Sequence, residues 1–155
     1  MKRMLIVLLI LAVGMAYAQT ATGEHIGSKK CKMCHSKAEV GSQYSIWEKG
    51  PHSGSFETLK TDAAKAIAKK MGLKVSPDQA PKCLSCHVTG WGTESGYQLE
   101  VDPLNKKAVK KNSDLSRVGC ESCHGAGSLY KSKKTKAAIA AGTITGESVG
   151  LITIT

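Results

Sequence analysis

The chain carries one five-residue pattern, Cys-x-x-Cys-His, at three separate positions. The three copies are Cys31–His35, Cys83–His87 and Cys120–His124, called the first, second and third motif below. Together they use all six cysteines and three of the five histidines. Because no cysteine remains outside a motif, the chemistry of this pattern constrains every fold that the chain can adopt.

Cys-x-x-Cys-His is the signal for covalent attachment of a c-type haem. The two thiols add to the haem vinyl groups as thioethers, and the histidine that follows supplies an axial ligand to the iron. The sequence therefore predicts three covalently attached haem c groups. The predicted attachment residues are Cys31, Cys34, Cys83, Cys86, Cys120 and Cys123, and the proximal iron ligands are His35, His87 and His124.

Two other kinds of site use paired cysteines. Two of the pairs could form a four-cysteine zinc site, and six cysteines in a short exported chain could form a disulfide framework. Neither explains why a histidine follows the cysteine pair in all three motifs. Haem attachment is therefore the favoured interpretation.

The N-terminus is typical of a secretory signal peptide over residues 1–18. Lys2 and Arg3 precede an apolar run, Leu5–Val13, and the run is followed by the small-x-small pattern Ala16–Ala18. The apolar run is short for a membrane span. We expect cleavage after this pattern, no membrane span in the mature chain, and a location in the periplasm or on the outer cell surface.

About 137 residues remain after cleavage, which suits a single domain. We assign residues 19–142 to a multihaem cytochrome c domain and residues 143–155 to an irregular tail. The chain has one Phe and two Trp. A domain so poor in large apolar residues needs a further source of stability, such as disulfides or a bound group. We expect the haems to supply that core and the chain without haem to be largely unfolded.

The formal net charge is +10. Loss of the signal peptide and attachment of three oxidised haems with ionised propionates bring the charge to about +5. A basic surface attracts acidic proteins, so the expected partners are redox proteins with acidic docking surfaces. Nucleic acid is not an expected partner, because aromatic residues are not interleaved with the lysines. The oligomeric state stays open.

Periodicity and breakers predict three helices, at His35–Lys49, Thr61–Met71 and Leu129–Ala141. The glycine-rich stretch 88–119 is predicted as loop, with a short hairpin near 97–101. The motifs start 52 and 37 positions apart, which argues against a tandem repeat. The predicted fold class is mainly α with long loops, with little or no sheet.

Three irons have six axial positions, and the chain has five histidines. His52 and His25 are the two histidines outside the motifs, so histidine can complete at most two haems. His52 is the stronger candidate, because it follows a rigid Gly-Pro turn; His25 lies near the new N-terminus, where chains are poorly ordered. The third haem takes Met71 or another ligand, borrows one from a partner chain, or stays open.

Three segments resemble the cytochrome c-554 family of periplasmic multihaem cytochromes. They are Gly27–His35 followed by Trp47, Pro51-His52 and Phe56; Cys83–Tyr97; and Val118–Tyr130. The resemblance covers residues 24–141 and implies a helical multihaem cytochrome c fold wrapped around stacked haems, electron transfer, and a distal ligand role for His52. Family members usually carry a fourth motif after the helix that corresponds to Leu129–Ala141. This chain has none there, which would fit a truncated or frameshifted reading or a genuine three-haem variant.

The predicted function is transfer of single electrons between redox partners, and we expect a carrier rather than an enzyme. One alternative is a reductase whose open haem acts on a small nitrogen compound such as nitric oxide or nitrite. The other is a subunit of a haem-wired surface complex, in which histidines of a partner complete the ligation.

Overall fold

The structure, a computed structural model, describes residues 22–154, so the predicted signal peptide lies outside the described residues. Short helices and long loops make up this part of the chain, and it contains no strand. The α-helices are α2 (Lys29–His35), α3 (Gln43–Lys49), α4 (Ser55–Thr58), α5 (Asp62–Lys70), α6 (Pro81–His87), α7 (Lys106–Leu115), α8 (Cys120–His124) and α9 (Lys133–Ala140). The 3-10 turns are η2 (Ala38–Val40), η3 (Pro51–Gly54), η4 (Pro77–Gln79) and η5 (Glu147–Val149). The prediction of a mainly helical fold with long loops is confirmed.

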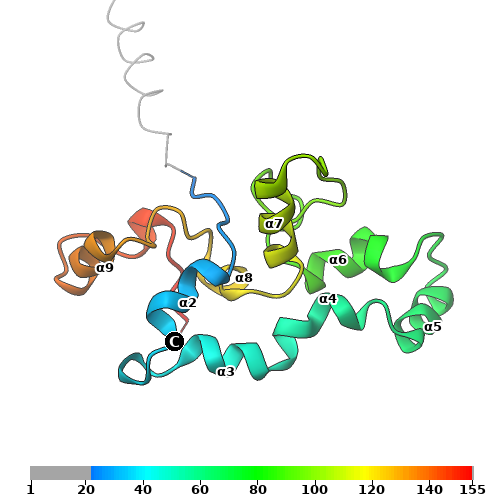
Figure 1. Ribbon diagram of the computed structural model, residues 1–155, viewed down its shortest axis with the longest axis horizontal. Helices are drawn as coiled ribbons and strands as arrows, with labels where there is room; N and C mark the ends of the chain where they lie inside the picture. Colours follow the sequence, from blue (N-terminus) through cyan, green and yellow to red (C-terminus); the bar gives the residue numbers. More distant parts are fainter. Residues whose placement is uncertain (1–21, 155) are drawn as a thin grey trace, which may run out of the picture.

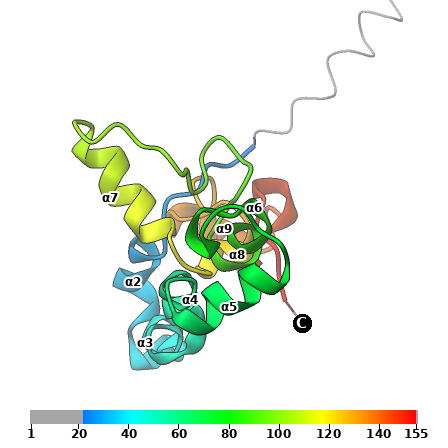
Figure 2. The ribbon, with the colours of Figure 1, turned by 90° about the vertical axis from the view of Figure 1, so that its right-hand side faces the viewer.

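The helices do not stack in layers. In Figure 1 the helices that carry the motifs follow one another from left to right as α2, α8 and α6, although α8 is the last of them in the sequence. In Figure 2, seen along the long axis, α6, α8 and α9 lie behind one another near the centre of the view, and α7 projects to one side. The third motif therefore lies between the first two. No helix among residues 22–154 is long and apolar enough to cross a membrane.

The largest apolar cluster surrounds the second motif and is small. It consists of Leu59, Leu84, Val88, Tyr97 and Leu115, with Phe56 and Trp91 packed against it. By contrast, many large apolar side chains are exposed, including Met33 at 81 % and Ile46 at 68 %. The chain thus buries a modest core of its own and leaves several large apolar side chains exposed, Met33 of the first motif among them.

The predicted helix from His35 to Lys49 is wrong in its first half. Helix α2 ends at His35, the chain turns at Gly41 with a φ of +92°, and α3 begins only at Gln43. Glycine adopts a positive φ without the steric cost that other residues meet. The second half of the predicted helix is confirmed as α3. There Tyr44 is buried, and its ring centroid lies 5.2 Å from that of Trp47.

The helix predicted over Thr61–Met71 is confirmed as α5. The Thr61 hydroxyl caps it by accepting a hydrogen bond from the backbone N–H of Ala64 at 3.2 Å, and Gly72 follows with a φ of +69°. Met71, which directly follows α5, is 51 % exposed.

The helix predicted over Leu129–Ala141 begins later than expected, at Lys133. Its cap is Ser132, whose hydroxyl accepts from the Thr135 N–H at 3.0 Å. The residues before it are used elsewhere. The hydroxyl of Ser128 accepts from the Glu24 N–H at 2.7 Å, and Tyr130 donates to the Gly125 carbonyl at 2.7 Å.

The stretch predicted as loop, 88–119, contains the helix α7. Asn105 caps it by accepting from the Ala108 N–H at 3.0 Å. The glycines that suggested loop lie in residues 90–96, whereas α7 itself contains neither glycine nor proline. The short hairpin expected near 97–101 is wrong: this segment has no strand.

Candidate functional site

Each cysteine pair lies on a short helix. The first, second and third motifs fall on α2, α6 and α8, so the two thiols of each pair are three residues apart on a helix and point to one side. All six thiols are free, and each is at least partly accessible. These helices therefore present both sulfurs of a pair together to one bound group.

The imidazole of His87 is held by a backbone carbonyl. Its Nδ1 lies 2.7 Å from the carbonyl oxygen of Ser55, and the Ser55 hydroxyl donates to the His87 carbonyl at 2.8 Å. A carbonyl oxygen can only accept, so Nδ1 carries the proton and the lone pair is on Nε2. Metal-binding histidines commonly hold this arrangement, which fixes the ring and leaves Nε2 to bind the metal.

His124 is held in the same way by the C-terminal segment. Its Nδ1 lies 3.0 Å from the carbonyl oxygen of Ile152, and the Ile152 N–H donates to the His124 carbonyl at 3.0 Å. The Nε2 atom of His124 therefore also carries the lone pair. Residues 143–154, predicted as an irregular tail, thus orient the third motif, while the domain boundary at residue 142 stays a prediction.

His35 has a different partner. Its Nε2 lies 2.8 Å from the side-chain amine of Lys136 on α9. A lysine ammonium can only donate, so Nε2 accepts and again carries the lone pair. Nε2 thus carries the lone pair in His35, His87 and His124, and in His35 that lone pair accepts from Lys136.

Two buried hydroxyls join the three motifs. Ser28, which precedes α2, accepts from the N–H of Cys120 in the third motif at 3.2 Å. Thr89, which follows α6, lies 3.0 Å from the hydroxyl of Ser122 in the third motif and accepts from the Gly119 N–H at 2.9 Å. Ser28 and Thr89 are only 2 % and 1 % exposed. The first and second motifs are therefore each fastened to the third.

The first cysteines of the first and third motifs are neighbours. A hydrogen bond from the Cys31 thiol lowers the pKa of Cys120 to about 6, and a hydrogen bond from Ser28 acts in the same direction. The same interaction with Cys120, together with burial, raises the pKa of Cys31 well above its usual range. The attachment points of these two motifs thus lie side by side.

Glu121 is a functional residue that the pattern did not reveal. It occupies a variable position of the third motif, is 3 % exposed, and accepts hydrogen bonds from three backbone N–H groups. The donors are Ile26 at 2.9 Å, Gly27 at 2.7 Å and Gly127 at 2.7 Å. Its carboxylate fastens the chain on both sides of the third motif, and only the fold brings these donors together.

The two histidines outside the motifs have contrasting surroundings. His25 is held: its Nδ1 lies 3.0 Å from the Ser95 hydroxyl, and its ring packs so closely on Gly90 that a Cβ there would come within 2.8 Å of Nε2. His52 lies in η3 with an exposed ring, and its carbonyl accepts from the Val118 N–H at 3.2 Å. His25 is thus better anchored than its position near the N-terminus suggested.

The residues fit a covalently attached haem at each motif. Each site offers two accessible thiols on one helix face and an imidazole whose lone pair is on Nε2. In His35 this lone pair accepts from Lys136, so that contact would have to open for iron to bind. Among residues 22–154 no three His, Cys, Asp or Glu side chains come together as ligands for a metal ion alone. Two thiols and one imidazole at each motif are the groups that would hold a haem through thioethers and a nitrogen ligand.

Known proteins with similar sequences point to the same chemistry. A family model described as cytochrome c554 and c-prime matches residues 30–125. A curated cytochrome c-554 from Nitrosomonas europaea is 35 % identical over 131 residues, which are 83 % of this chain and 49 % of that protein. The chain therefore spans about half the length of the curated relative it matches. No solved structure matches the chain.

Proposed function

Because the chain belongs to the cytochrome c554 and c-prime family, and so is a c-type cytochrome that binds haem and transfers electrons, we propose that it relays single electrons through three haems. The cysteines of the three motifs hold the haems, and His35, His87 and His124 are their proximal ligands. The haem iron supplies the one-electron chemistry when it is bound. The protein holds the haems near one another and sets the environment of each iron.

One observation carries this proposal: the attachment points of the three haems are fastened together. Ser28 joins the first motif to the third, Thr89 joins the second to the third, and the Cys31 and Cys120 thiols are neighbours. Centres held close together can exchange electrons without moving the chain. The third motif, between the other two, is the natural central position of the relay.

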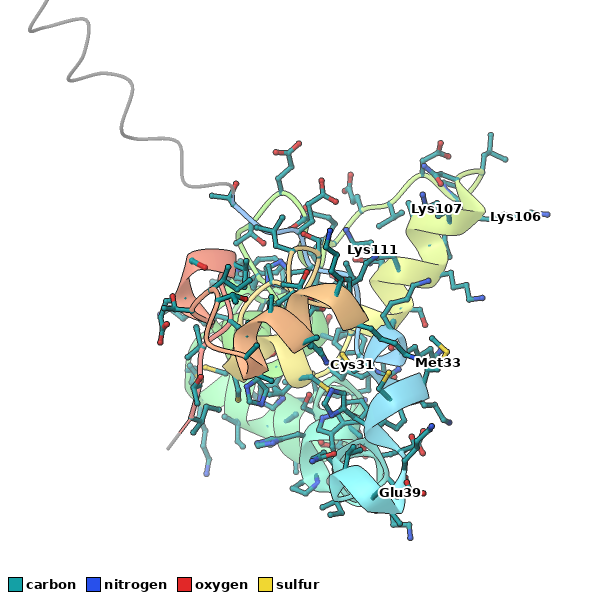
Figure 3. The ribbon with its side chains drawn as sticks, turned by 90° about the vertical axis from the view of Figure 1, so that its left-hand side faces the viewer. Cys31, Met33, Glu39, Lys106, Lys107 and Lys111 are labelled. Carbon is teal, nitrogen blue, oxygen red and sulfur yellow. The ribbon has the colours of Figure 1, made fainter. Side chains whose placement is uncertain are left out.

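We also propose that the protein is exported and that its partners are acidic redox proteins. The lysines of α7 support the acidic partners. Lys106, Lys107 and Lys110 are exposed, and Figure 3 shows Lys106 and Lys107 at the outer end of that helix. Positive charge on an open surface speeds encounter with a negatively charged partner.

The experiment that tests the relay measures electron exchange with an acidic redox protein at increasing ionic strength. We expect three one-electron equivalents to be taken up per chain. The bimolecular rate should fall as salt rises, because salt screens exposed charges beyond about 10 Å at 0.1 M. A chain that accepts only one electron would contradict the relay. A rate that is independent of salt would contradict the acidic partner.

The distal ligand roles of His52 and His25 are part of this proposal. The exposed ring of His52 makes no hydrogen bond within residues 22–154, so its replacement removes little from the fold. We expect His52→Ala to convert one low-spin ferric haem to high spin in electron paramagnetic resonance. Added imidazole should restore the low-spin signal. A low-spin spectrum unchanged in His52→Ala would exclude His52 as a ligand.

A further inference from the structure

We propose that Lys136 is the distal iron ligand of the haem attached to the first motif. Its side-chain amine donates to Nε2 of His35 at 2.8 Å, so the two nitrogens face each other across the position that iron would take, and binding iron would draw them apart. This inference rests on the proposed function, because it requires a haem at Cys31 and Cys34.

The position of Lys136 differs from that of its neighbours. Helix α9 carries three lysines, and Lys133 and Lys134 are exposed, whereas Lys136 is half-buried and directed at α2. Its charge is also close enough to the Cys31 thiol to act on it. In Figure 3, Cys31 lies beside α9, while Met33 of the same motif points away from the molecule. One amine of this helix is thus placed at the donor atoms of the first motif.

Three haem irons have one more axial position than the histidines can fill. Five histidines cannot fill six axial positions. The ring of His25 packs on Gly90, three residues beyond the second motif, and the carbonyl of His52 is bound by Val118, two residues before the third motif. His25 and His52 therefore contact segments next to the second and third motifs. Lys136 contacts the first motif.

An amine nitrogen can bind iron once it is neutral. On coordination the Lys136 ammonium releases its proton to solvent, and the freed lone pair forms the bond to iron; no oxidation or reduction accompanies this step. Lysine differs from arginine in this respect, because a guanidinium keeps its proton in proteins. With Lys136, His25 and His52 as distal ligands, each of three irons has a second nitrogen ligand. No axial position then remains open for a small substrate.

The first test uses the unaltered holoprotein labelled with ¹⁵N-lysine. Peptide mass analysis first establishes that the first motif carries haem; if it does not, the proposed function fails at this motif. With haem present, electron–nuclear double resonance on the ferric protein should show a ¹⁵N coupling from lysine on one low-spin centre. No lysine coupling on any low-spin centre would overturn the assignment and leave the relay intact.

Substitutions provide the second test. We expect Lys136→Ala and Lys136→Arg each to convert one low-spin haem to high spin, because neither side chain offers a nitrogen lone pair. The matched control, Lys134→Ala, lies on the same helix with an exposed side chain and should leave all spin states unchanged. If Lys136→Arg keeps the low-spin spectrum that Lys136→Ala loses, Lys136 acts through its charge and the assignment is wrong. If these variants do not accumulate, the labelled protein decides alone.

Discussion

A chain made without haem attachment, for example with all six cysteines replaced by alanine, should be largely unfolded. The described helices are five to ten residues long apart from the single turn of α4. Isolated helices shorter than about 12–15 residues are marginal in water. The apolar cluster around the second motif holds five buried residues, which is a small core for a domain of this size. Most of the stability must therefore come from the haems.

The measurement is far-UV circular dichroism with hydrogen exchange, compared between this variant and the haem-loaded protein. We expect the helical signal to fall strongly and amide protection to be lost throughout the chain. The control is the same cysteine-free chain in a concentrated osmolyte, which favours burial and should recover part of the helical signal. Native-like helicity and cooperative unfolding of the cysteine-free chain in plain buffer would contradict the expectation.

Glu121→Ala should be the most destabilising single substitution outside the attachment and ligand residues. It leaves the N–H groups of Ile26, Gly27 and Gly127 without their acceptor. A buried donor that loses its partner costs about 1–3 kcal/mol. The free energy of unfolding should therefore fall by about 3 kcal/mol or more. Chemical denaturation of the haem-loaded protein, followed by circular dichroism, measures this loss.

Two further variants define the cause of that loss. Glu121→Gln keeps one oxygen acceptor and should lose distinctly less stability than Glu121→Ala. The control, Glu39→Ala, removes an exposed glutamate in η2, and surface substitutions of this kind usually change stability by about 0.5 kcal/mol or less. Equal stability losses in Glu121→Ala and Glu39→Ala would show that the buried carboxylate does not hold the third motif.

The parts of the structure that depend on nearby residues were predictable from the sequence. The spacing within each motif predicts the thiols and the proximal histidines, and the structure places each motif on one short helix. The cap at Thr61 and the glycine after Met71 identified α5, because both signals act within one helical turn. Glycines near one end of 88–119 obscured α7, whose own residues favour a helix. Local signals also failed at His35–Lys49, where the chain turns at Gly41, and before Lys133, where α9 begins later than predicted.

The residues that organise the site act over long sequence separations and could not be predicted in this way. Glu121 and Ile26 are 95 positions apart, and His35 and Lys136 are 101 apart. In the sequence, Glu121 occupies an unspecified position of the third motif. Lys136 belongs to a lysine-rich segment, which favours a solvent-exposed helix surface. Both residues have their roles because the fold buries them wholly or partly. The periodicity of the sequence does not show this burial.

The proposed relay depends on three haems covalently attached to one chain. Intact-mass spectrometry of the purified protein, combined with a pyridine haemochrome assay, counts these haems. We expect three haem equivalents per polypeptide, one on each cysteine pair, none of them extractable by acid acetone. Fewer than three equivalents, or colour that leaves the polypeptide on extraction, would overturn the three-haem relay.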